Sequence, residues 1–401
     1  MIIIDALYWL LFTYLLLYSL HFLIGHLSSL FYHPEKHTNI ANISDHLSQI
    51  TILIPAYKVD EGFPERLKNL RASLDGLPHT MYVLFQHCEQ KIIDESVPFC
   101  HHFDKATFNH LEGNPYHHAL RYALDQIKNH HPESTHILVL DPDNIIEEKA
   151  YSKFLTYTKT DADVIQGQRI PDTTSGSTSQ FDAISERLNN IQFRRSKVVQ
   201  RLYIELAGSG MMLRYNLFKE AVENLDTDAP GMDKNLLIQL IRIDPFIKMH
   251  YDERITIVDE KTSQPDQLHR QRLRWFANQY FNAFRYAYTL IKLSITHRIL
   301  APADYAITLA RPPRSVQFLL AILLPVTELV LLFFDTISTP YLTIAMLPFI
   351  AGTAIFVVSN PDVIRPSKIP ELIYLALKNS LSALLSLHPK LKGTFISTRN
   401  K

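Results

Sequence analysis

The sequence predicts an α/β protein with a mostly parallel central sheet, flanked by transmembrane helices on its N- and C-terminal sides. Two observations predict this fold class. Between residues 48 and 290, short β-branched runs alternate with amphipathic helical patterns, which is typical of a parallel sheet covered by helices. On either side of this region lie nearly uncharged stretches, within residues 6–32 and 315–358, that are long enough to cross a bilayer.

Composition narrows the classes of function. The 40 Lys and Arg balance the 40 Asp and Glu, so a basic nucleic-acid-binding protein is not expected. The two cysteines, Cys88 and Cys100, have neither metal-binding nor redox spacing, which favours a body that faces the cytosol. The sequence has no internal period, which argues against a repeat protein.

The first predicted element is a transmembrane anchor over residues 1–32. Its apolar run lacks a basic leader and a small-residue cleavage site, which favours an uncleaved anchor over a signal peptide. Asp5 precedes the run, and Lys36 and a region rich in Lys and Arg follow it. The positive-inside rule then predicts an N-terminus outside and a body in the cytosol.

The body begins with a predicted buried strand over residues 49–57, which ends in a Pro-Ala-Tyr loop. Helices over residues 63–77 and 116–129 and strands over residues 81–85 and 136–140 follow. In such a sheet, ligands bind in the crevice at the carboxyl ends of the strands. We therefore expect the loops after these strands to form the site.

The strand over residues 136–140 stops at Asp141-Pro142-Asp143-Asn144. Two carboxylates one residue apart at a strand end can hold a divalent cation that bridges phosphate oxygens. A polar turn is the alternative, because Asp, Pro and Asn all favour turns. The buried strand before the tetrapeptide favours a functional site.

Two further motifs follow a helix predicted over residues 179–199. The glycines of Gly208-Ser209-Gly210 allow the backbone to approach a ligand closely, although an ordinary turn explains them equally well. Asp233 precedes an amphipathic helix over residues 236–241. Two functions fit this aspartate: an N-cap, or a general base that takes a proton from an attacking hydroxyl.

The body ends with a strand near residues 255–259 and a helix that carries Gln271-Arg272-Leu273-Arg274-Trp275. Helical spacing gives this segment a cationic, aromatic face, which suits a diphosphate and a sugar ring. Alone the pentapeptide is a weak signal, because Arg and Trp near a membrane commonly anchor the interface.

The C-terminal part is predicted to hold interfacial helices over residues 291–314 and two transmembrane helices within 315–358. Glu328 lies inside the first of these, where a carboxylate marks either a transport pathway or a helix contact. Residues 359–401 are predicted to hold an interfacial or transmembrane helix, over 369–387, and a basic tail. The basic residues of the tail are Lys390, Lys392, Arg399 and Lys401.

Taken in order, the segments I-L-I-P-A-Y, D-P-D-N, G-S-G, M-D-K-N-L and Q-R-L-R-W resemble the motifs of membrane-bound family 2 glycosyltransferases. This group includes the cellulose, chitin and hyaluronan synthases, and the resemblance covers residues 50–400. It implies a GT-A (nucleotide-diphospho-sugar transferase) domain over residues 48–290. The implied reaction is inverting, metal-dependent transfer of a sugar from a nucleotide-sugar, with a UDP-sugar as the leading expectation, to a glycan or lipid-linked acceptor. Processive polysaccharide synthesis and single transfer both remain open.

The resemblance also implies roles for single residues. Asp141 and Asp143 match the metal pair that would hold Mg²⁺ or Mn²⁺, and Asp233 matches the catalytic base. The residues expected to contact the nucleotide-sugar are Pro55, Ala56, Tyr57, Glu89 and Asp141. Those expected to contact the acceptor or the diphosphate are Gly208, Ser209, Gly210, Gln271, Arg274 and Trp275.

The chain departs from the family pattern at the second strand, where Gln86-His87-Cys88-Glu89 replaces the usual aspartate that contacts the base. Glu89 or Gln86 is expected to take its place. Tyr116-His117 replaces the usual Gly-Lys, and Met232 precedes the catalytic aspartate where the family usually has Glu. These changes support an alternative function, a catalytically silent subunit that binds a partner synthase.

The resemblance implies the following partners: a nucleotide-sugar donor, a glycan or lipid-linked acceptor, membrane lipids and the partner subunits of an export complex. No nucleic acid is among them. The implied location is the bacterial inner membrane, with the catalytic domain in the cytosol.

Overall fold

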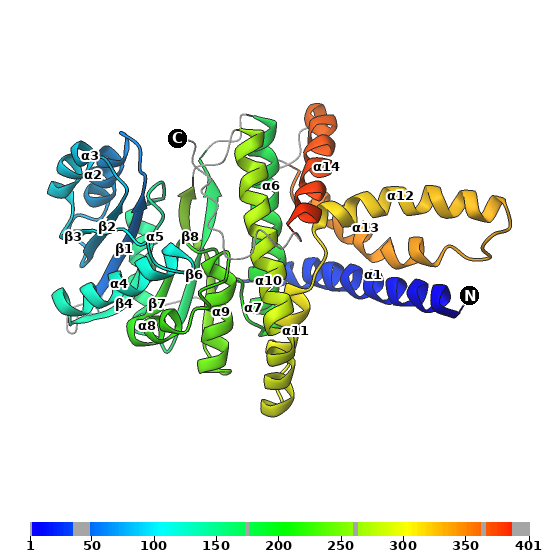
Figure 1. Cartoon of the computed structure of the whole chain (residues 1–401), viewed down its shortest axis with the longest axis horizontal. Helices are drawn as coiled ribbons and strands as arrows, with labels where there is room; N and C mark the ends of the chain where they lie inside the picture. The colour runs from blue at the N-terminus through cyan, green and yellow to red at the C-terminus, as the bar shows by residue number, and fades with distance from the viewer. Residues whose placement is uncertain (1, 35–48, 173–175, 260–263, 362–365, 387–401) are drawn as a thin grey trace.

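The computed structural model describes residues 2–34, 49–172, 176–259, 264–361 and 366–386. The predicted basic tail within residues 387–401 and the loop residues 260–263 lie outside these ranges. A body that contains the β-sheet occupies one end of the molecule. The helices α1 (Ile2–Ser29), α12 (Arg314–Phe333) and α13 (Tyr341–Ser359) project from the other end (Figure 1).

The body is built on a mixed eight-stranded sheet with the order β3-β2-β1-β4-β7-β6-β8-β5. The strands are β1 (Gln49–Tyr57), β2 (Thr80–Gln86), β3 (His102–Lys105), β4 (Ser134–Val139), β5 (Ile145–Ile146), β6 (Val164–Pro171), β7 (Met211–Arg214) and β8 (Met249–Asp259). The first four strands pair in parallel, as predicted. The prediction of a mostly parallel sheet is only partly correct, because β7 is antiparallel to β4 and β6, and β5 is antiparallel to β8.

The direction of β7 follows from the loop that precedes it. The Gly210 N–H donates to the carbonyl oxygen of Val139, the last residue of β4, across 2.8 Å. The chain therefore enters β7 at the carboxyl end of β4, and it can only run back along that strand.

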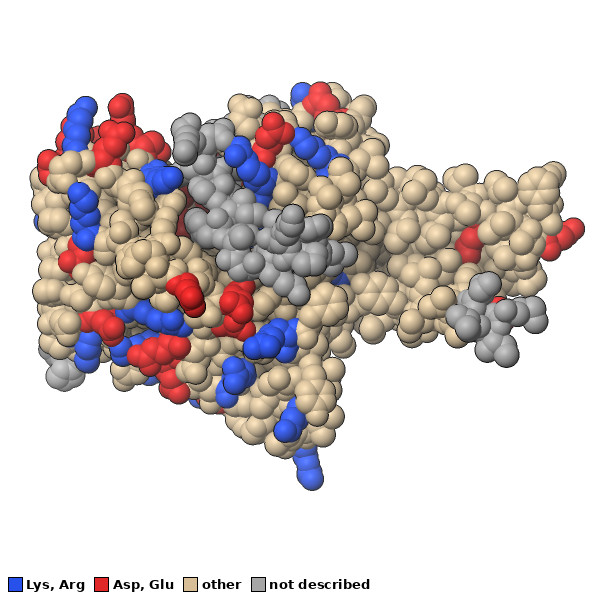
Figure 2. Space-filling view, viewed as in Figure 1, with Lys and Arg blue, Asp and Glu red and all other residues tan. Residues whose placement is uncertain are grey.

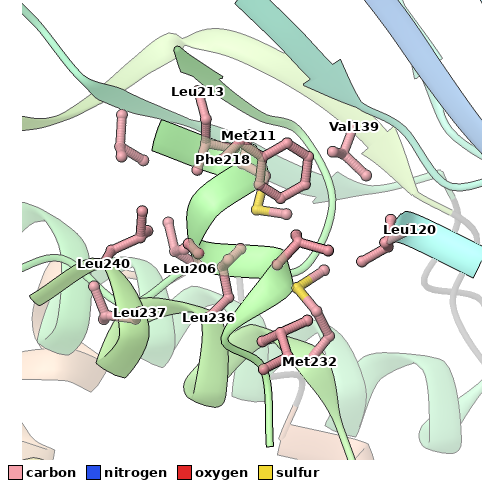
Figure 3. Packing of buried hydrophobic residues seen from close by; sticks show 14 of the residues in the cluster. Leu120, Val139, Leu206, Met211, Leu213, Phe218, Met232, Leu236, Leu237 and Leu240 are labelled. Carbon is pink, nitrogen blue, oxygen red and sulfur yellow. The ribbon is translucent and has the colours of Figure 1, made fainter. Parts of the chain in front are cut away.

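Helices cover both faces of the sheet. One face packs against α2 (Phe63–Ser73), α3 (Gln90–Ser96), the short η1 (Val97–Phe99) and α5 (Glu148–Tyr157). The other packs against α4 (Pro115–His130), α8 (Tyr215–Glu223) and α9 (Met232–Ile243). Leu53 of β1 belongs to the second core and its neighbours Ile52 and Ile54 to the first, as the two-residue period of a strand requires. Figure 3 shows leucines of α9 beside Met211 and Phe218 in the second core.

The helix predicted over residues 179–199 is present as a composite of three segments. These are α6 (Ser177–Asn190), the π-helical η2 (Ile191–Arg195) and α7 (Ser196–Gln200). The helix with the Arg-Trp motif is much longer than its periodicity indicated, because α10 spans Pro265–His297. The following α11 (Ala301–Leu309) packs against it, with the Gln279 amide donating to the carbonyl oxygen of Leu309 across 3.1 Å.

Among the described residues, three helices are long and apolar enough to span a membrane: residues 5–29 of α1 (Ile2–Ser29), α12 (Arg314–Phe333) and α13 (Tyr341–Ser359). They correspond to the three predicted spans. Charged side chains gather over the body, and the surface of the projecting helices is almost free of them in the view of Figure 2. After η3 (Pro366–Lys368), α14 (Ile369–Leu385) packs against α10, α12 and α6.

Glu328, the carboxylate inside the first C-terminal span, joins α12 to α13. Its Oε1 accepts the N–H of Leu342 across 3.1 Å, and its Oε2 accepts the N–H of Thr343 across 2.8 Å. The Tyr8 hydroxyl of α1 donates to Oε1 across 3.3 Å. A carboxylate at this place offsets the partial positive charge of the α13 N-terminus. The structure thus supports the helix contact among the two explanations for Glu328.

Candidate active site

The ends of β1, β2 and β4 lie side by side at one edge of the sheet, because these strands pair in parallel. Of the three residues predicted to line a nucleotide pocket from β1, Pro55 and Ala56 are buried inside the strand and Tyr57 is partly exposed. The Tyr57 ring lies 5.5 Å from the ring of His87, which follows β2. The contact of Pro55, Ala56 and Tyr57 with a nucleotide stays a prediction. Glu89 is exposed at the N-terminus of α3.

The Asp-Pro-Asp-Asn segment folds into a hydrogen-bonded turn directly after β4. The Asp141 N–H donates to Oδ1 of Asn144 across 3.1 Å, and the Asn144 amide donates to Oδ1 of Asp143 across 3.3 Å. Asp141 N–H also donates to the Ser209 hydroxyl across 3.1 Å, and that hydroxyl donates to Asn144. The segment is thus a turn, and the turn holds both carboxylates at the strand end.

Sequence reasoning missed the support beneath this turn. The Asn144 amide donates to Oδ1 of Asp259 across 3.2 Å, and Asp259 forms a buried ion pair with Arg169 at 2.6 Å. Arg169 also donates to the carbonyl oxygen of Ala207 across 3.1 Å. This bond connects the turn to the segment Gly208-Ser209-Gly210, which we call the glycine loop. A polar residue at the end of β8 was the available signal, since such positions commonly serve sites.

The two aspartates fit a divalent cation. Burial, and next the charge of Asp143, raises the pKa of Asp141 to about 7. A cation between the carboxylates would relieve this repulsion, and hard oxygen donors are what Mg²⁺ and Mn²⁺ prefer. In the part of the chain that the structure describes, no three His, Cys, Asp or Glu side chains are grouped to hold a metal. Two carboxylates completed by substrate phosphates are a usual set for Mg²⁺.

Asp233 lies in the first turn of α9, whose N-cap is Gly231. The N-cap interpretation of Asp233 is therefore wrong. Its Oδ1 accepts the side-chain amide of Asn278 from α10 across 2.7 Å, and its Oδ2 lies 3.5 Å from the Lys234 ammonium. The helix N-terminus favours a charged carboxylate here.

The glycine loop passes directly beside Asp233. A β-carbon on Gly208 would lie 3.8 Å from the Asp233 β-carbon. Gly208 and Gly210 have left-handed φ values of +80° and +63°, which side chains rarely adopt. Ser209 and Gly210 are buried, whereas Gly208 is partly exposed. Of the predicted acceptor floor, Gly208 reaches the surface, and the Ser209 hydroxyl instead supports the Asp-Pro-Asp-Asn turn.

Arg274 brings the α10 motif to the same place. Burial lowers the pKa of its guanidinium, and the charges of Asp233 and Asp141 oppose that effect. The same charges act on Tyr116, whose pKa is raised by burial first and next by Asp141. Asp141, Tyr116, Asp233 and Arg274 therefore form one electrostatic cluster, drawn from four separate motifs of the sequence.

The other motif residues of α10 divide between two sides of the helix. Arg272 forms a buried ion pair with Asp182 of α6 at 2.7 Å, and its guanidinium stacks 4.4 Å from the centre of the Trp275 ring. Gln271 lies one turn before Arg274 on the same side of α10. Its Oε1 is buried and has no hydrogen-bond partner among the described residues.

A parallel sheet edge that joins paired carboxylates to a helix-borne carboxylate and an arginine is an arrangement suited to group transfer. A sequence model described as "Glycosyl transferase family group 2" matches residues 136–357. This match spans more than half of the chain, so the chain belongs to that family and is a family 2 glycosyltransferase. No curated protein sequence matches it.

One solved structure supports a GT-A-like fold. A mannosyltransferase from Pyrobaculum calidifontis, in complex with GDP-Man and Mn²⁺, superposes with a TM-score of 0.51 at 12% identity, over 96% of this chain and 98% of that one. Glucosyl-3-phosphoglycerate synthase from Mycobacterium tuberculosis, in complex with Mn²⁺, UDP and phosphoglyceric acid, gives a TM-score of 0.39 at 13% identity. That match covers 55% of this chain and 73% of the synthase.

Proposed function

We propose that this protein transfers a sugar, with inversion, from a nucleotide-sugar to a glycan or lipid-linked acceptor at a membrane surface. The observation that carries the proposal is the cluster of Asp141, Asp233 and Arg274. It combines a carboxylate suited to a metal, a carboxylate suited to a general base and a cation suited to a departing diphosphate. Each comes from a different motif, and the charge of Arg274 interacts with those of both aspartates.

Asp141 and Asp143 would hold Mg²⁺ or Mn²⁺ against the donor diphosphate. Bound there, the cation supplies positive charge that stabilises the departing nucleoside diphosphate. Tyr57, partly exposed at the end of β1, is the strand-end residue with surface to offer a nucleotide base. Glu89 is exposed just after β2, at the same edge of the sheet, and it is proposed to contact the donor as well.

The reaction would be a single in-line displacement. The acceptor hydroxyl oxygen forms a bond to the anomeric carbon, while the bond from that carbon to the diphosphate oxygen breaks. The hydroxyl proton passes to the Asp233 carboxylate, and the electron pair leaves with the diphosphate beside Arg274. Gly208 borders Asp233, and its lack of a side chain gives an acceptor room to approach.

The acceptor side would include Gln271 and Trp275. Gln271 shares a helix side with Arg274, and a substrate hydroxyl would give its buried Oε1 the hydrogen-bond partner that it lacks among the described residues. Trp275 is partly exposed, and Arg272 fixes its ring from one face, which leaves the other suited to a sugar.

Membrane association is supported by the three apolar helices. The proposed organisation is an anchor over residues 1–32, a cytosolic domain over 48–290, interfacial helices over 291–314, two spans within 315–358 and a last helix in 359–401. The cytosolic orientation in a bacterial inner membrane belongs to this proposal. Processive synthesis and single transfer both stay open within it, as does assembly with an export complex.

The test is the release of nucleoside diphosphate from purified protein held in nanodiscs with Mg²⁺ or Mn²⁺. The donor panel contains UDP-sugars and GDP-mannose, the latter because a fold neighbour binds it. Asp233→Asn is expected to lower turnover by about 100- to 10,000-fold. Asp244→Asn, at the other end of α9, is the matched control and should retain turnover.

Product size then separates polymer synthesis from single transfer. Full turnover by Asp233→Asn would contradict the role of the base. Metal-dependent binding of a nucleoside diphosphate, without turnover for any donor and acceptor, would instead support the silent-subunit alternative.

A further inference from the structure

Buried amide side chains form a continuous line between α9 and α10 beneath Asp233. We call this line the amide ladder, and it consists of Asn278, Asn282, Asn235 and Gln239. Their exposed fractions are 4%, 0%, 0% and 1%, so water does not compete for their hydrogen bonds. The two helices that carry them pack against each other (Figure 1).

The hydrogen bonds run in one direction. Arg242 donates to Oε1 of Gln239 across 2.7 Å, and the Gln239 amide donates to Oδ1 of Asn235 across 3.4 Å. The Asn235 amide donates to Oδ1 of Asn282 across 2.8 Å, and the Asn282 amide donates to Oδ1 of Asn278 across 2.8 Å. The last bond is the 2.7 Å contact from the Asn278 amide to Oδ1 of Asp233.

Chemistry at both ends fixes this direction. A carboxylate only accepts, so Asn278 must present its amide nitrogen to Asp233 and its oxygen to Asn282. The Asn282 nitrogen also donates to the backbone carbonyl of Asn278 across 2.8 Å, which fixes its orientation independently. At the far end, Arg242 can only donate, so Gln239 must present its oxygen to it. Within the ladder, the Asp226 N–H donates to Oδ1 of Asn235 across 2.9 Å. Turning one amide around would place two donors or two acceptors in contact inside the core.

We propose that the amide ladder positions the Asp233 carboxylate for proton transfer, with Asn278 as the residue that holds it. Asn278 holds Oδ1 at 2.7 Å, whereas the Lys234 ammonium lies farther from Oδ2, at 3.5 Å, so we assign the acceptor proton to Oδ2. This inference rests on the proposed function of Asp233 as the general base. Productive geometry tolerates about 0.5 Å of error, and a chain of satisfied amides between two helices supplies that rigidity.

The packing of Gly231 against Asn278 also supports the role of Asn278 in holding Asp233. A β-carbon on Gly231 would lie 2.8 Å from the side-chain nitrogen Nδ2 of Asn278 and 3.0 Å from its side-chain carbon Cγ. The φ of Gly231 is −153°, an extended value that alanine adopts without strain. The glycine before the Met232-Asp233 pair thus leaves space for the amide that reaches the aspartate.

The first experiment compares Asn278→Leu and Asn282→Leu with the control Gln279→Met. Gln279 is an equally buried amide of α10, but it donates to the backbone carbonyls of Leu309 and Arg311. We expect kcat to fall by about tenfold to 100-fold in Asn278→Leu and by less in Asn282→Leu, which does not touch Asp233. KM for the donor should stay unchanged, since the ladder does not contact the strand-end loops. Gln279→Met should keep the wild-type kcat.

Gly231→Ala provides a second route, with Gly176→Ala as its control. Both glycines are N-caps, of α9 and α6, but a β-carbon on Gly176 would meet its nearest atom, the Ser179 hydroxyl oxygen, at 3.7 Å. We expect Gly231→Ala to lower kcat as Asn278→Leu does, and Gly176→Ala to leave it unchanged. Equal kcat values for the ladder variants and their controls would overturn the positioning role.

Two comparisons separate failure of the ladder from failure of the proposed function. If Asp233→Asn abolishes turnover and Asn278→Leu does not change it, the ladder alone is wrong. If Asp233→Asn keeps turnover, Asp233 is not the general base, and the positioning role of the amide ladder is overturned as well. A structure of Asn278→Leu gives a readout that needs no turnover: an Asp233 carboxylate within about 0.5 Å of its present position would also overturn the inference.

Discussion

Arg311 donates to Glu205 across 2.9 Å, and both side chains are largely buried. Glu205 lies three residues before the glycine loop that borders Asp233, and Arg311 lies three residues before α12, a candidate membrane span. This ion pair therefore connects the edge of the candidate active site with the start of the C-terminal helical hairpin.

The pair predicts a specific dependence of stability on pH. Burial tends to raise the pKa of Glu205, but Arg311, Lys234 and Arg194 outweigh it and lower the pKa to about 2. Because the folded-state pKa lies below the unfolded value of about 4.3, the stabilisation is complete above that value. It is lost as the pH falls from about 4.3 through 2.

Glu205→Gln should abolish this part of the acid sensitivity. At pH 7 the variant leaves Arg311 without its buried counter-charge, which typically costs about 3 to 5 kcal/mol. Unfolding of the two proteins in nanodiscs, measured from pH 7 to pH 2, checks both statements. Stability curves that stay parallel across this range would contradict the assigned role of the pair.

Removal of a metal ligand should separate nucleotide binding from folding. Asp143→Asn keeps the shape of the turn but removes one of the two carboxylates after β4. We expect the gain in UDP or GDP affinity on adding Mn²⁺ to fall by at least about tenfold, because changes near a bound metal commonly cost that much. Calorimetric titration with and without EDTA measures this gain, and Asp94→Asn, on α3, is a control. An unchanged gain in Asp143→Asn would show that the cation binds elsewhere.

Arg274→Lys should strongly lower activity even though it retains the positive charge. A lysine keeps the positive charge but loses the planar fork that grips a diphosphate with two donors. We expect kcat/KM to fall by about 100-fold, the cost of one preorganised donor at a transition state. Arg285→Lys, at a more exposed position of the same helix, should behave as wild type. Equal kinetics for the two variants would contradict a role of Arg274 at the leaving group.

Glu328→Gln tests the cap between α12 and α13. Glutamine offers one acceptor oxygen in place of two, so one N–H of the α13 N-terminus loses its partner. The expected loss of stability is about 1 to 3 kcal/mol, measured by unfolding of the purified protein in detergent. Thr327→Val changes a neighbouring side chain that bonds within its own helix, and it should have no comparable effect. The cap would be disproved by equal stabilities.

The features that could be predicted from sequence are those written in neighbouring residues. Asp141 follows an apolar strand and Asp233 opens an amphipathic helix, so their places at the sheet edge follow from local patterns. The α10 motif was also recognisable, and Arg274 does reach the cluster with Asp233 and Asp141.

The features that were missed depend on pairing between distant segments. The reversal of β7 is determined by where the glycine loop meets β4, which no composition or periodicity encodes. Asn278 and Asn282 looked like ordinary helix residues, because their partners lie on α9.

The first helix of the chain completes its contacts only with segments made much later. Phe22 of α1 packs against Phe349 of α13 with ring centres 4.6 Å apart, and Gly352 of α13 leaves room for the Phe22 ring. A ribosome makes α1 before the body and α13 after it, so α1 lacks this partner helix while the whole transferase domain is being made. The pairing of α1 with α13 therefore forms last, and a chain stopped before α13 leaves the ribosome with an apolar first helix that lacks this neighbour.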